Sequence, residues 1–443
     1  MSDKTGWQKR IFSFSNLTGL QLYQLIRYGT FIAASIGFAK MQLPQSAIGE
    51  FETFLMVSSM LSFFWVSGII NTMLSIYPKA DNAERSQIFF NAFLTLLFFG
   101  VAAGVLFFIF SNNLFSFLNK QNAGTFVKPV VIYLVANSPS FLIEYILYLS
   151  NRKKVIVVYA LLSSVVTLCV VLIPVALGYN IVYTFYGLVA VALLKIVVTF
   201  FLIQQMGSLR VNVALQFTNL KVSLPLMLSI LVSGSSEYID GLIVKKKFDD
   251  VAFAVYRYGA KELPVLLIVA NTFSTAMIAV VSADLTEGLE EIKRKSARLM
   301  HLFFPLSIAL MLTSHFLFQY VFSESFIYSA FIFNIYLLLI VPRLLFPQTI
   351  LMGMRQSGFL LASSVIEITV NVSLSLWMAA KFGLLGIAMA TFVAFCSDKM
   401  FLMAVNYFKF GIAPQRYIPV LLHVVYSVLL FAGFAAGYWI SVN

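Results

Sequence analysis

Charged residues are scarce in this chain of 443 residues, since Asp, Glu, Lys and Arg together make up 11% of it. A soluble domain usually carries about 25% charged residues, and it cannot hide a composition that is 60% hydrophobic from water. Cysteine and histidine are scarce too, with two and three residues and no Cys-x-x-Cys or Cys/His spacing. The sequence therefore argues against a soluble enzyme, and we predict no metal site.

The sequence consists largely of long apolar runs. We count thirteen, each with about the 20 residues that cross ~30 Å of hydrocarbon as a helix. We predict an all-α polytopic membrane protein with about 13 transmembrane helices, and 12 to 14 are compatible with the pattern. The predicted spans are residues 17–39, 49–76, 88–110, 129–149, 155–177, 182–203, 222–244, 251–281, 299–322, 326–351, 359–380, 384–403 and 418–440.

Two pairs of similar segments indicate an internal repeat. LPQSAIGEF at 43–51 aligns with FDDVAFAVY at 248–256, and an Arg-bearing loop followed by an apolar run with a Ser-Ser pair occurs from 148 and again from 351. The two members of each pair are separated by nearly the same number of residues, which favours a duplicated architecture.

Six spans per copy is an even number, so both copies enter the membrane from the same side. We predict two parallel six-helix lobes, 1–210 and 211–410, related by a pseudo-two-fold axis along the membrane normal, and one extra C-terminal helix within 411–443. A cleft between such lobes suits alternating access. A symmetric bundle without a passage, such as a scaffold, is the alternative.

The basic residues predict the orientation, because Lys and Arg in short loops tend to stay in the cytoplasm. With the N-terminus inside, the cytoplasmic segments hold 17 basic residues and the opposite side holds seven. We therefore predict a cytoplasmic N-terminus. The net charge of +12 then lies mostly in loops beside anionic lipid head groups, and we expect no nucleic-acid binding because no basic soluble domain is present.

Three of the basic residues inside apolar runs stand out, because a charge there costs from about 2.5 to more than 10 kcal/mol unless it faces water or a partner. Arg27 lies about ten residues into the first span, near mid-depth at ~1.5 Å per residue. Lys261 lies about as deep in the eighth span, and Arg257 precedes it by one turn on the same face. Since Arg27 has no acid in its own helix, we interpret it as unpaired, and we predict that the three residues form a cationic site shared between the lobes.

Acidic residues in the seventh span have two interpretations. Glu237 and Asp240 are three residues apart and share one helix face at about the depth of Arg257. They either neutralise Arg257 within one lobe or take part in coupling to Na⁺ or H⁺. Weaker candidates for the cavity, for which an interhelical hydrogen bond or a snorkelling amine is the alternative, are Glu144, Lys195, Arg343, Glu367 and Asn371.

The region of the first two spans combines a basic start, the Arg27 helix, PQSAIGEF at 44–51 and SGIINTMLSIYPKAD at 67–81. In these features it resembles Wzx-type polysaccharide flippases of the multidrug/oligosaccharidyl-lipid/polysaccharide (MOP) exporter superfamily. The family's Gly-acidic-aromatic start of helix two is matched by Gly49, Glu50 and Phe51. At helix eight Ala254, Val255 and Tyr256 replace it. The resemblance extends over the first twelve spans.

The resemblance implies a transporter rather than an enzyme, in the cytoplasmic (inner) membrane of a bacterium. Such proteins move an undecaprenyl-diphosphate-linked oligosaccharide from the cytoplasmic to the periplasmic leaflet, for O-antigen, capsule or related glycans. In the similar lipid II flippases, cations on helices one and eight meet the diphosphate, and the matching positions here are Arg27, Arg257 and Lys261. The implied partners are the polyprenyl-diphosphate-linked oligosaccharide, membrane lipids, a polysaccharide polymerase and glycosyltransferases, with no cofactor beyond a coupling Na⁺ or H⁺.

Two other functions stay open. A cation-coupled multidrug antiporter of the same superfamily is favoured by Glu237 and Asp240, although embedded basic residues would repel a cationic drug. A membrane-embedded glycan enzyme would need a catalytic acid or base in a sizeable loop, and the loops here are short.

Overall fold

The computed structural model describes residues 19–78, 80–118 and 124–442. The chain is 88% helical, and the described residues contain no strand. Inside hydrocarbon no water can bond to the backbone, and a helix satisfies each N–H and C=O within its own segment. The predicted all-α, multi-span class is confirmed.

The helices of the first half are α1 (Gly19–Lys40), α2 (Gln45–Met60), α3 (Phe63–Ile76), α4 (Asn82–Phe117), α5 (Gly124–Ser140), α6 (Leu142–Leu149), α7 (Lys153–Ala176) and α8 (Val182–Met206). The second half holds α9 (Val213–Gly234), α10 (Ser236–Lys247), α11 (Asp250–Gly259), α12 (Pro264–Ala283), α13 (Leu285–Leu317), α14 (Ile327–Leu338), α15 (Ile340–Arg343), α16 (Pro347–Gly353), α17 (Ser357–Phe410) and α18 (Val420–Val442). Short π and 3₁₀ turns lie at Phe318–Phe322, Glu324–Phe326 and Pro414–Arg416.

Ten helical segments of the described chain are long and apolar enough to cross a membrane, and an eleventh is added if α2 and α3, which are bent by 47°, form one span. One of the ten, Gly358–Phe410, is 53 residues long and contains two of the predicted spans. Gly383 bends it between them with a φ of 60°, which a residue with a Cβ rarely adopts. Helix α1 is not among the ten, although its 22 residues extend ~33 Å. Within the described residues, each predicted span coincides with one helix or with two or three shorter helices in succession.

Several predicted spans are broken in the structure, and two of these breaks lie beside candidate site residues. The span predicted at 222–244 divides at Ser235 into α9 and α10, and the span predicted at 251–281 divides at residues 260–263 into α11 and α12. Pro264 begins α12, where its missing N–H is harmless, and proline disfavours helix in the residue before it. Lys261 lies in this break, so the prediction that it shares a helix face with Arg257 is wrong.

Packing divides the described residues into two units, with 19–37, 61–78, 80–112 and 124–227 in unit 1 and 38–60, 113–118 and 228–442 in unit 2. Helix α2 thus packs with unit 2, whereas the predicted lobe boundaries assign it to the first lobe. The predicted lobes and their symmetry axis stay a prediction.

Within unit 1, α8 packs against α5 and α7. Helices α7 and α8 come close at Gly187, where a Cβ would lie 2.8 Å from the carbonyl oxygen of Val170. Helix α1 joins α7 through Tyr23 stacked on Tyr159 and through a 2.7 Å hydrogen bond from Thr30 to Ser164. These contacts fix α1 at the position from which Arg27 projects.

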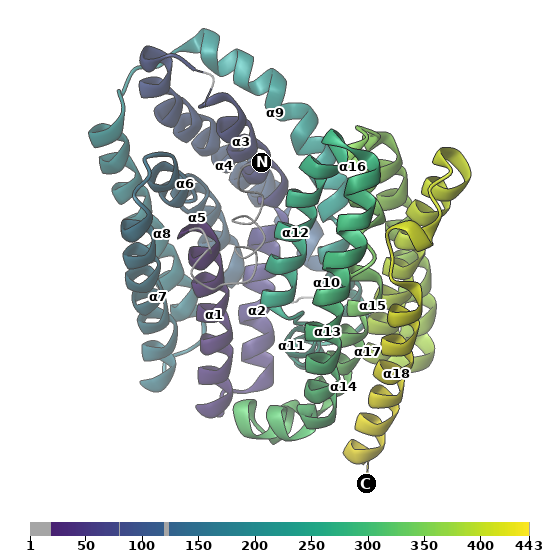
Figure 1. Cartoon of the computed structure of the whole chain (residues 1–443). Helices are drawn as coiled ribbons and strands as arrows, with labels where there is room; N and C mark the ends of the chain where they lie inside the picture. Colours follow the sequence, from purple (N-terminus) through teal and green to yellow (C-terminus); the bar gives the residue numbers. More distant parts are fainter. Residues whose placement is uncertain (1–18, 79, 119–123, 443) are drawn as a thin grey trace. The chain divides into compact units, whose positions relative to one another are not determined.

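Within unit 2, α11 packs on α2 and α13 packs on α18, which runs beside it in Figure 1. At Gly49 a Cβ would lie 1.9 Å from the carbonyl oxygen of Asp250, so only glycine permits this approach of α2 to α11. Gly433 and Gly437 form a Gly-x-x-x-Gly pair on α18 that faces α13, and a Cβ at Gly437 would lie 2.8 Å from the carbonyl oxygen of Met311. The extra C-terminal helix is therefore an integral part of unit 2.

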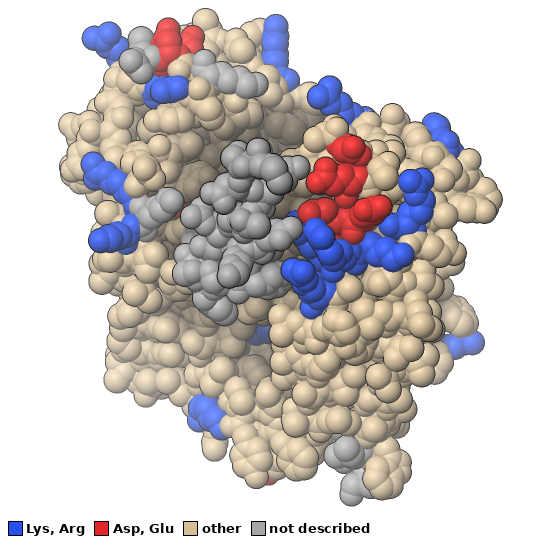
Figure 2. All heavy atoms as spheres, in the orientation of Figure 1, with Lys and Arg blue, Asp and Glu red and all other residues tan. Residues whose placement is uncertain are grey.

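The surface agrees with a membrane environment. Most of the face in Figure 2 carries neither acidic nor basic side chains, and the charges that it does carry gather in a few places. Large apolar side chains are exposed on several helices, including Phe408 at 83% and Leu421 at 80%. A soluble protein would bury such residues, whereas acyl chains solvate them. The chain is a multi-pass membrane protein.

Candidate functional site

The first candidate residue, Arg27, projects from the middle of α1 in unit 1. Its guanidinium carbon lies 5.3 Å from the ring centre of Phe141 and 5.9 Å from that of Tyr23. Aromatic faces attract a cation without neutralising it. The side chain stays 44% exposed within unit 1 despite its place in an apolar span. Arg27 is thus held in position and open to a ligand.

An acid approaches Arg27 from another helix. Nη1 of Arg27 lies 3.9 Å from Oε1 of Glu144 on α6, whose side chain is only 4% exposed. The interpretation of Arg27 as unpaired is therefore wrong. The separation exceeds the 2.7–2.9 Å of a charge-assisted hydrogen bond, so the pair is a loose one. Lys195 on α8 also interacts electrostatically with Glu144, so the buried acid has a second cation in unit 1.

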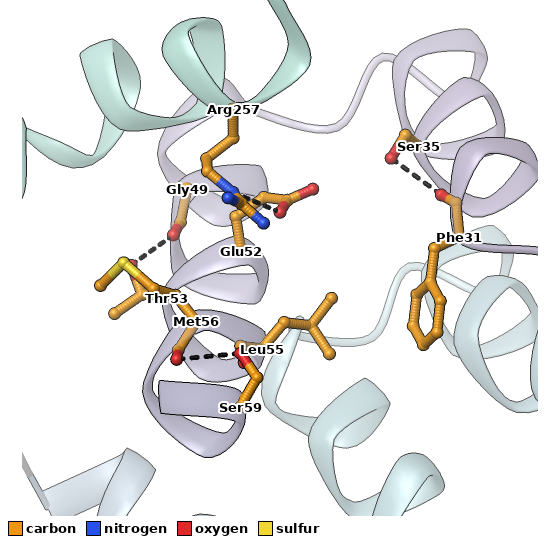
Figure 3. Close-up of polar contacts among 9 residues, drawn as sticks. All are labelled: Phe31, Ser35, Gly49, Glu52, Thr53, Leu55, Met56, Ser59 and Arg257. Atoms are coloured by element: carbon orange, nitrogen blue, oxygen red, sulfur yellow. Dashed lines mark hydrogen bonds and ion pairs between the residues drawn. The ribbon is translucent and has the colours of Figure 1, made fainter. Parts of the chain in front are cut away.

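A similar group lies in unit 2. Figure 3 shows the guanidinium of Arg257 on α11 directed at Glu52 on α2, with 3.3 Å between Nε and Oε2. The Glu52 side chain is 6% exposed and that of Arg257 is 36% exposed. Asp240 does not take the neutralising role predicted for it, because its carboxylate bonds elsewhere. The side chain of Glu237 lies outside the described part of the chain.

Lys261 belongs to the same group by a route that the sequence did not predict. Its Nζ lies 4.6 Å from the ring centre of Tyr258, and it interacts electrostatically with Glu52 and Arg257. The break between α11 and α12, rather than a shared helix face, brings it there. Arg257 and Lys261 thus come together around one buried glutamate.

Asp240 on α10 forms a separate polar centre inside unit 2. Its Oδ2 accepts hydrogen bonds from Tyr256 at 3.0 Å, from Tyr336 at 2.9 Å and from Thr391 at 2.5 Å. The residue is 5% exposed, and no donor among the described residues reaches its buried Oδ1. Asn371 extends the network through a 3.4 Å hydrogen bond to Thr391.

The donor set at Asp240 suits a small hard cation or a proton. A buried carboxylate without a basic partner is costly as an anion, and hydroxyl and amide oxygens are the ligands that hard cations prefer. Asp240 and Asn371 were predicted from the sequence. Tyr256, Tyr336 and Thr391 were not predicted as site residues, since they come from three other helices and each looks like an ordinary residue of an apolar run.

The remaining predicted residues have structural partners. Arg343 on α15 forms a two-pronged pair with Glu262, with Nε–Oε2 and Nη2–Oε1 distances of 2.6 and 2.5 Å, and lies 4.9 Å from the ring centre of Phe395. Glu262 lies in the break after α11, so this pair braces the break. Glu367 on α17 interacts favourably with Lys399 and Arg343 and forms a hydrogen bond with Ser236, whereas Asp398 repels it. None of these contacts brings Arg343 or Glu367 to the Asp240 centre.

The fold and these embedded charges define a class. A bundle of membrane-spanning helices that holds half-exposed arginines and a buried polar centre has the construction of a membrane transporter. The fold is similar to the lipid II flippase MurJ in an inward closed conformation, with a TM-score of 0.66 and 14% identity over 95% of this chain and 97% of that one. It is also similar to an inward-facing multidrug resistance MATE family transporter of the MOP superfamily, with a TM-score of 0.62 and 14% identity over 96% and 95%.

A third similar structure is a mutant of the Vibrio cholerae MATE transporter VcmN, with a TM-score of 0.55 and 12% identity over 88% of this chain and 97% of that one. No curated protein matches the chain in sequence. A family model described as polysaccharide biosynthesis protein matches residues 45–330, well over half of the chain. The chain belongs to this polysaccharide biosynthesis protein family, and the predicted resemblance is confirmed.

Proposed function

We propose that the protein is a flippase that moves an undecaprenyl-diphosphate-linked oligosaccharide from the cytoplasmic to the periplasmic leaflet by alternating access. The transported oligosaccharide would be used to synthesise O-antigen, capsule or a related polysaccharide. The protein would lie in a bacterial inner membrane with its N-terminus in the cytoplasm. Family membership supports a role in polysaccharide biosynthesis, and the fold supports transport rather than catalysis.

The cations support the diphosphate as the recognised group. Phosphate oxygens accept the planar arginine fork in two parallel hydrogen bonds, and a lysine adds a point charge. We assign the diphosphate contacts to Arg27, Arg257 and Lys261. The observation that carries this assignment is Arg27, a charged side chain in the middle of a membrane span that stays 44% exposed and is held by aromatic faces.

Coupling to Na⁺ or H⁺ is assigned to Asp240. Its buried Oδ1, together with the oxygens of Tyr256, Tyr336, Thr391 and Asn371, would hold the ion. The same centre favours the second candidate function, a cation-coupled multidrug antiporter. The half-exposed arginines oppose that candidate because they would repel a cationic drug.

Proteoliposomes test the proposal. They would contain the full-length protein and a fluorescent undecaprenyl-diphosphate-linked oligosaccharide, and a membrane-impermeant quencher would report which leaflet holds the label. We expect the protein to move the label between leaflets, and we expect Arg27→Ala to abolish this movement. Arg298→Ala, which removes an exposed arginine of α13, is the matched control and should transport normally.

Two results would contradict the proposal. Transport by Arg27→Ala at the normal rate would remove Arg27 from the site. A protein that leaves the lipid-linked oligosaccharide in place but expels a cationic dye from the same vesicles would be the antiporter.

A further inference from the structure

Glu144 is more deeply buried than the arginine that it faces, and this asymmetry needs an explanation. Its side chain is 4% exposed against 44% for Arg27, and the two charged groups are 3.9 Å apart. Its second oxygen, Oε2, is buried and has no hydrogen-bond donor among the described residues. A carboxylate that served only to fix α1 against α6 would gain most from close, two-pronged contact with the guanidinium.

Glu144 has a second cation in its surroundings and no tight bond to Arg27. Lys195 on α8 interacts electrostatically with the same carboxylate, so the acid has a second cation beside it. Arg27 has Phe141 and Tyr23 against its guanidinium, and these rings hold the guanidinium whether or not the acid is engaged. Either charge therefore keeps a partner if the Arg27–Glu144 pair opens.

We propose that Glu144 is a stand-in counter-ion, which neutralises Arg27 in the empty transporter and gives up the guanidinium to the substrate's diphosphate. The proposal rests on the proposed function. When the diphosphate binds, Lys195 remains as the partner of Glu144. When the substrate leaves, Glu144 recaptures Arg27. The acid thus competes with the ligand and weakens its binding.

The competition has a purpose in transport. A diphosphate that binds fixed cations without a competitor leaves slowly, since changes of affinity appear mostly in the dissociation rate. An internal anion that returns to the arginine lowers the affinity and speeds release. Glu144 is therefore a positioning residue that sets affinity and turnover in opposite directions.

The test measures binding and transport on the same variants. Farnesyl diphosphate, a short prenyl diphosphate, is titrated calorimetrically into the full-length protein in lipid nanodiscs. We expect Glu144→Gln to bind it about tenfold more tightly than the unchanged protein, because the competing anion is gone, and to transport more slowly by a similar factor. Glu144→Asp keeps the charge and should stay near the unchanged affinity. Glu290→Gln, which neutralises an exposed glutamate of α13, is the matched control.

A double variant shows whether the effect passes through Arg27. In an Arg27→Ala background Glu144→Gln should no longer tighten binding. Equal or weaker binding by the single variant Glu144→Gln, or the same tightening without Arg27, would overturn the proposal. If Glu144→Gln fails to fold because two cations lose their acid, the variant Glu144→Gln with Lys195→Gln removes one of them and should still bind more tightly.

A further measurement separates this inference from the proposed function. Labelling of Arg27 by phenylglyoxal, an arginine reagent, needs no substrate and is followed by peptide mass spectrometry. We expect faster labelling in Glu144→Gln than in the unchanged protein, and equal rates would contradict the counter-ion role. If no variant binds farnesyl diphosphate but labelling still accelerates, the diphosphate assignment fails and the counter-ion role stands.

Discussion

Arg27 in unit 1 and Arg257 in unit 2 are both half-exposed arginines that face a buried glutamate from a neighbouring helix, yet they are held differently. Arg257 lies 3.3 Å from Glu52, within hydrogen-bonding distance, whereas Arg27 lies 3.9 Å from Glu144 and has two aromatic rings near its guanidinium. A hydrogen-bonded pair fixes two helices, while a loose pair with aromatic support leaves the guanidinium available.

The packing around each pair agrees with this difference. Arg257 and Glu52 join α11 to α2 where the two backbones come so close that Gly49 is required. Each glutamate interacts electrostatically with a second cation, Lys195 for Glu144 and Lys261 for Glu52, so the close backbone approach at Gly49 is what distinguishes the pair in unit 2. From this difference we infer that the proposed ligand contact is the main role of Arg27, whereas Arg257 would serve both the proposed contact and the fold of unit 2.

The largest expected effect is that of Arg27→Ala on transport. Two charge-assisted hydrogen bonds contribute about 1.5–3 kcal/mol each, so their loss should slow transport at least about 100-fold. The melting temperature should change little, because the aromatic neighbours remain and the ion pair is loose. Transport assays and thermal unfolding of the same preparation check both parts. A large loss of stability would mean that the two arginines do not differ as described.

A smaller and mixed effect is expected for Arg257→Ala. Transport should fall about tenfold, since Lys261 remains beside the site, and the protein should also lose about 1–3 kcal/mol of stability because Glu52 is left buried without this partner. The same two measurements apply. If Arg257→Ala abolishes transport without any loss of stability, the roles of the two arginines are reversed.

Neutral variants of Glu52 and Glu144 test the same difference between the two ion pairs. Glu52→Gln should destabilise the protein more than Glu144→Gln, because only the first removes an acid at hydrogen-bonding distance from its arginine. Thermal unfolding of both variants at one pH, with Glu290→Gln as the reference, measures the difference. If the melting temperature shifts equally in both variants, the longer distance between Arg27 and Glu144 has no effect on stability.

The smallest effect on stability is expected at the Asp240 centre, where no arginine is involved. Asp240→Asn keeps the shape of the side chain and removes the charge, so the fold should persist while transport loses any response to an imposed Na⁺ or H⁺ gradient. If transport by the unchanged protein responds to neither gradient, the coupling role assigned to Asp240 is wrong.

The sequence predicted the fold to the level of its spans, because each apolar run is a local feature. It did not predict the break at 260–263 before Pro264, and Lys261 was therefore placed inside a helix although it lies in the break. Arg27 and Asp240 were identified because a charge in an apolar run is conspicuous by itself. Glu144 was only a weak candidate and Glu52 was not predicted as a site residue, since the pairing of helices far apart in the sequence leaves no local signal.

The most direct test of the account is the affinity of farnesyl diphosphate for Arg27→Ala and for Arg298→Ala, measured side by side in the same nanodiscs. The account predicts that the first variant binds at least about 30-fold more weakly than the unchanged protein and that the second binds equally well. Equal affinity for both variants would show that the arginine in the middle of α1 does not meet the diphosphate.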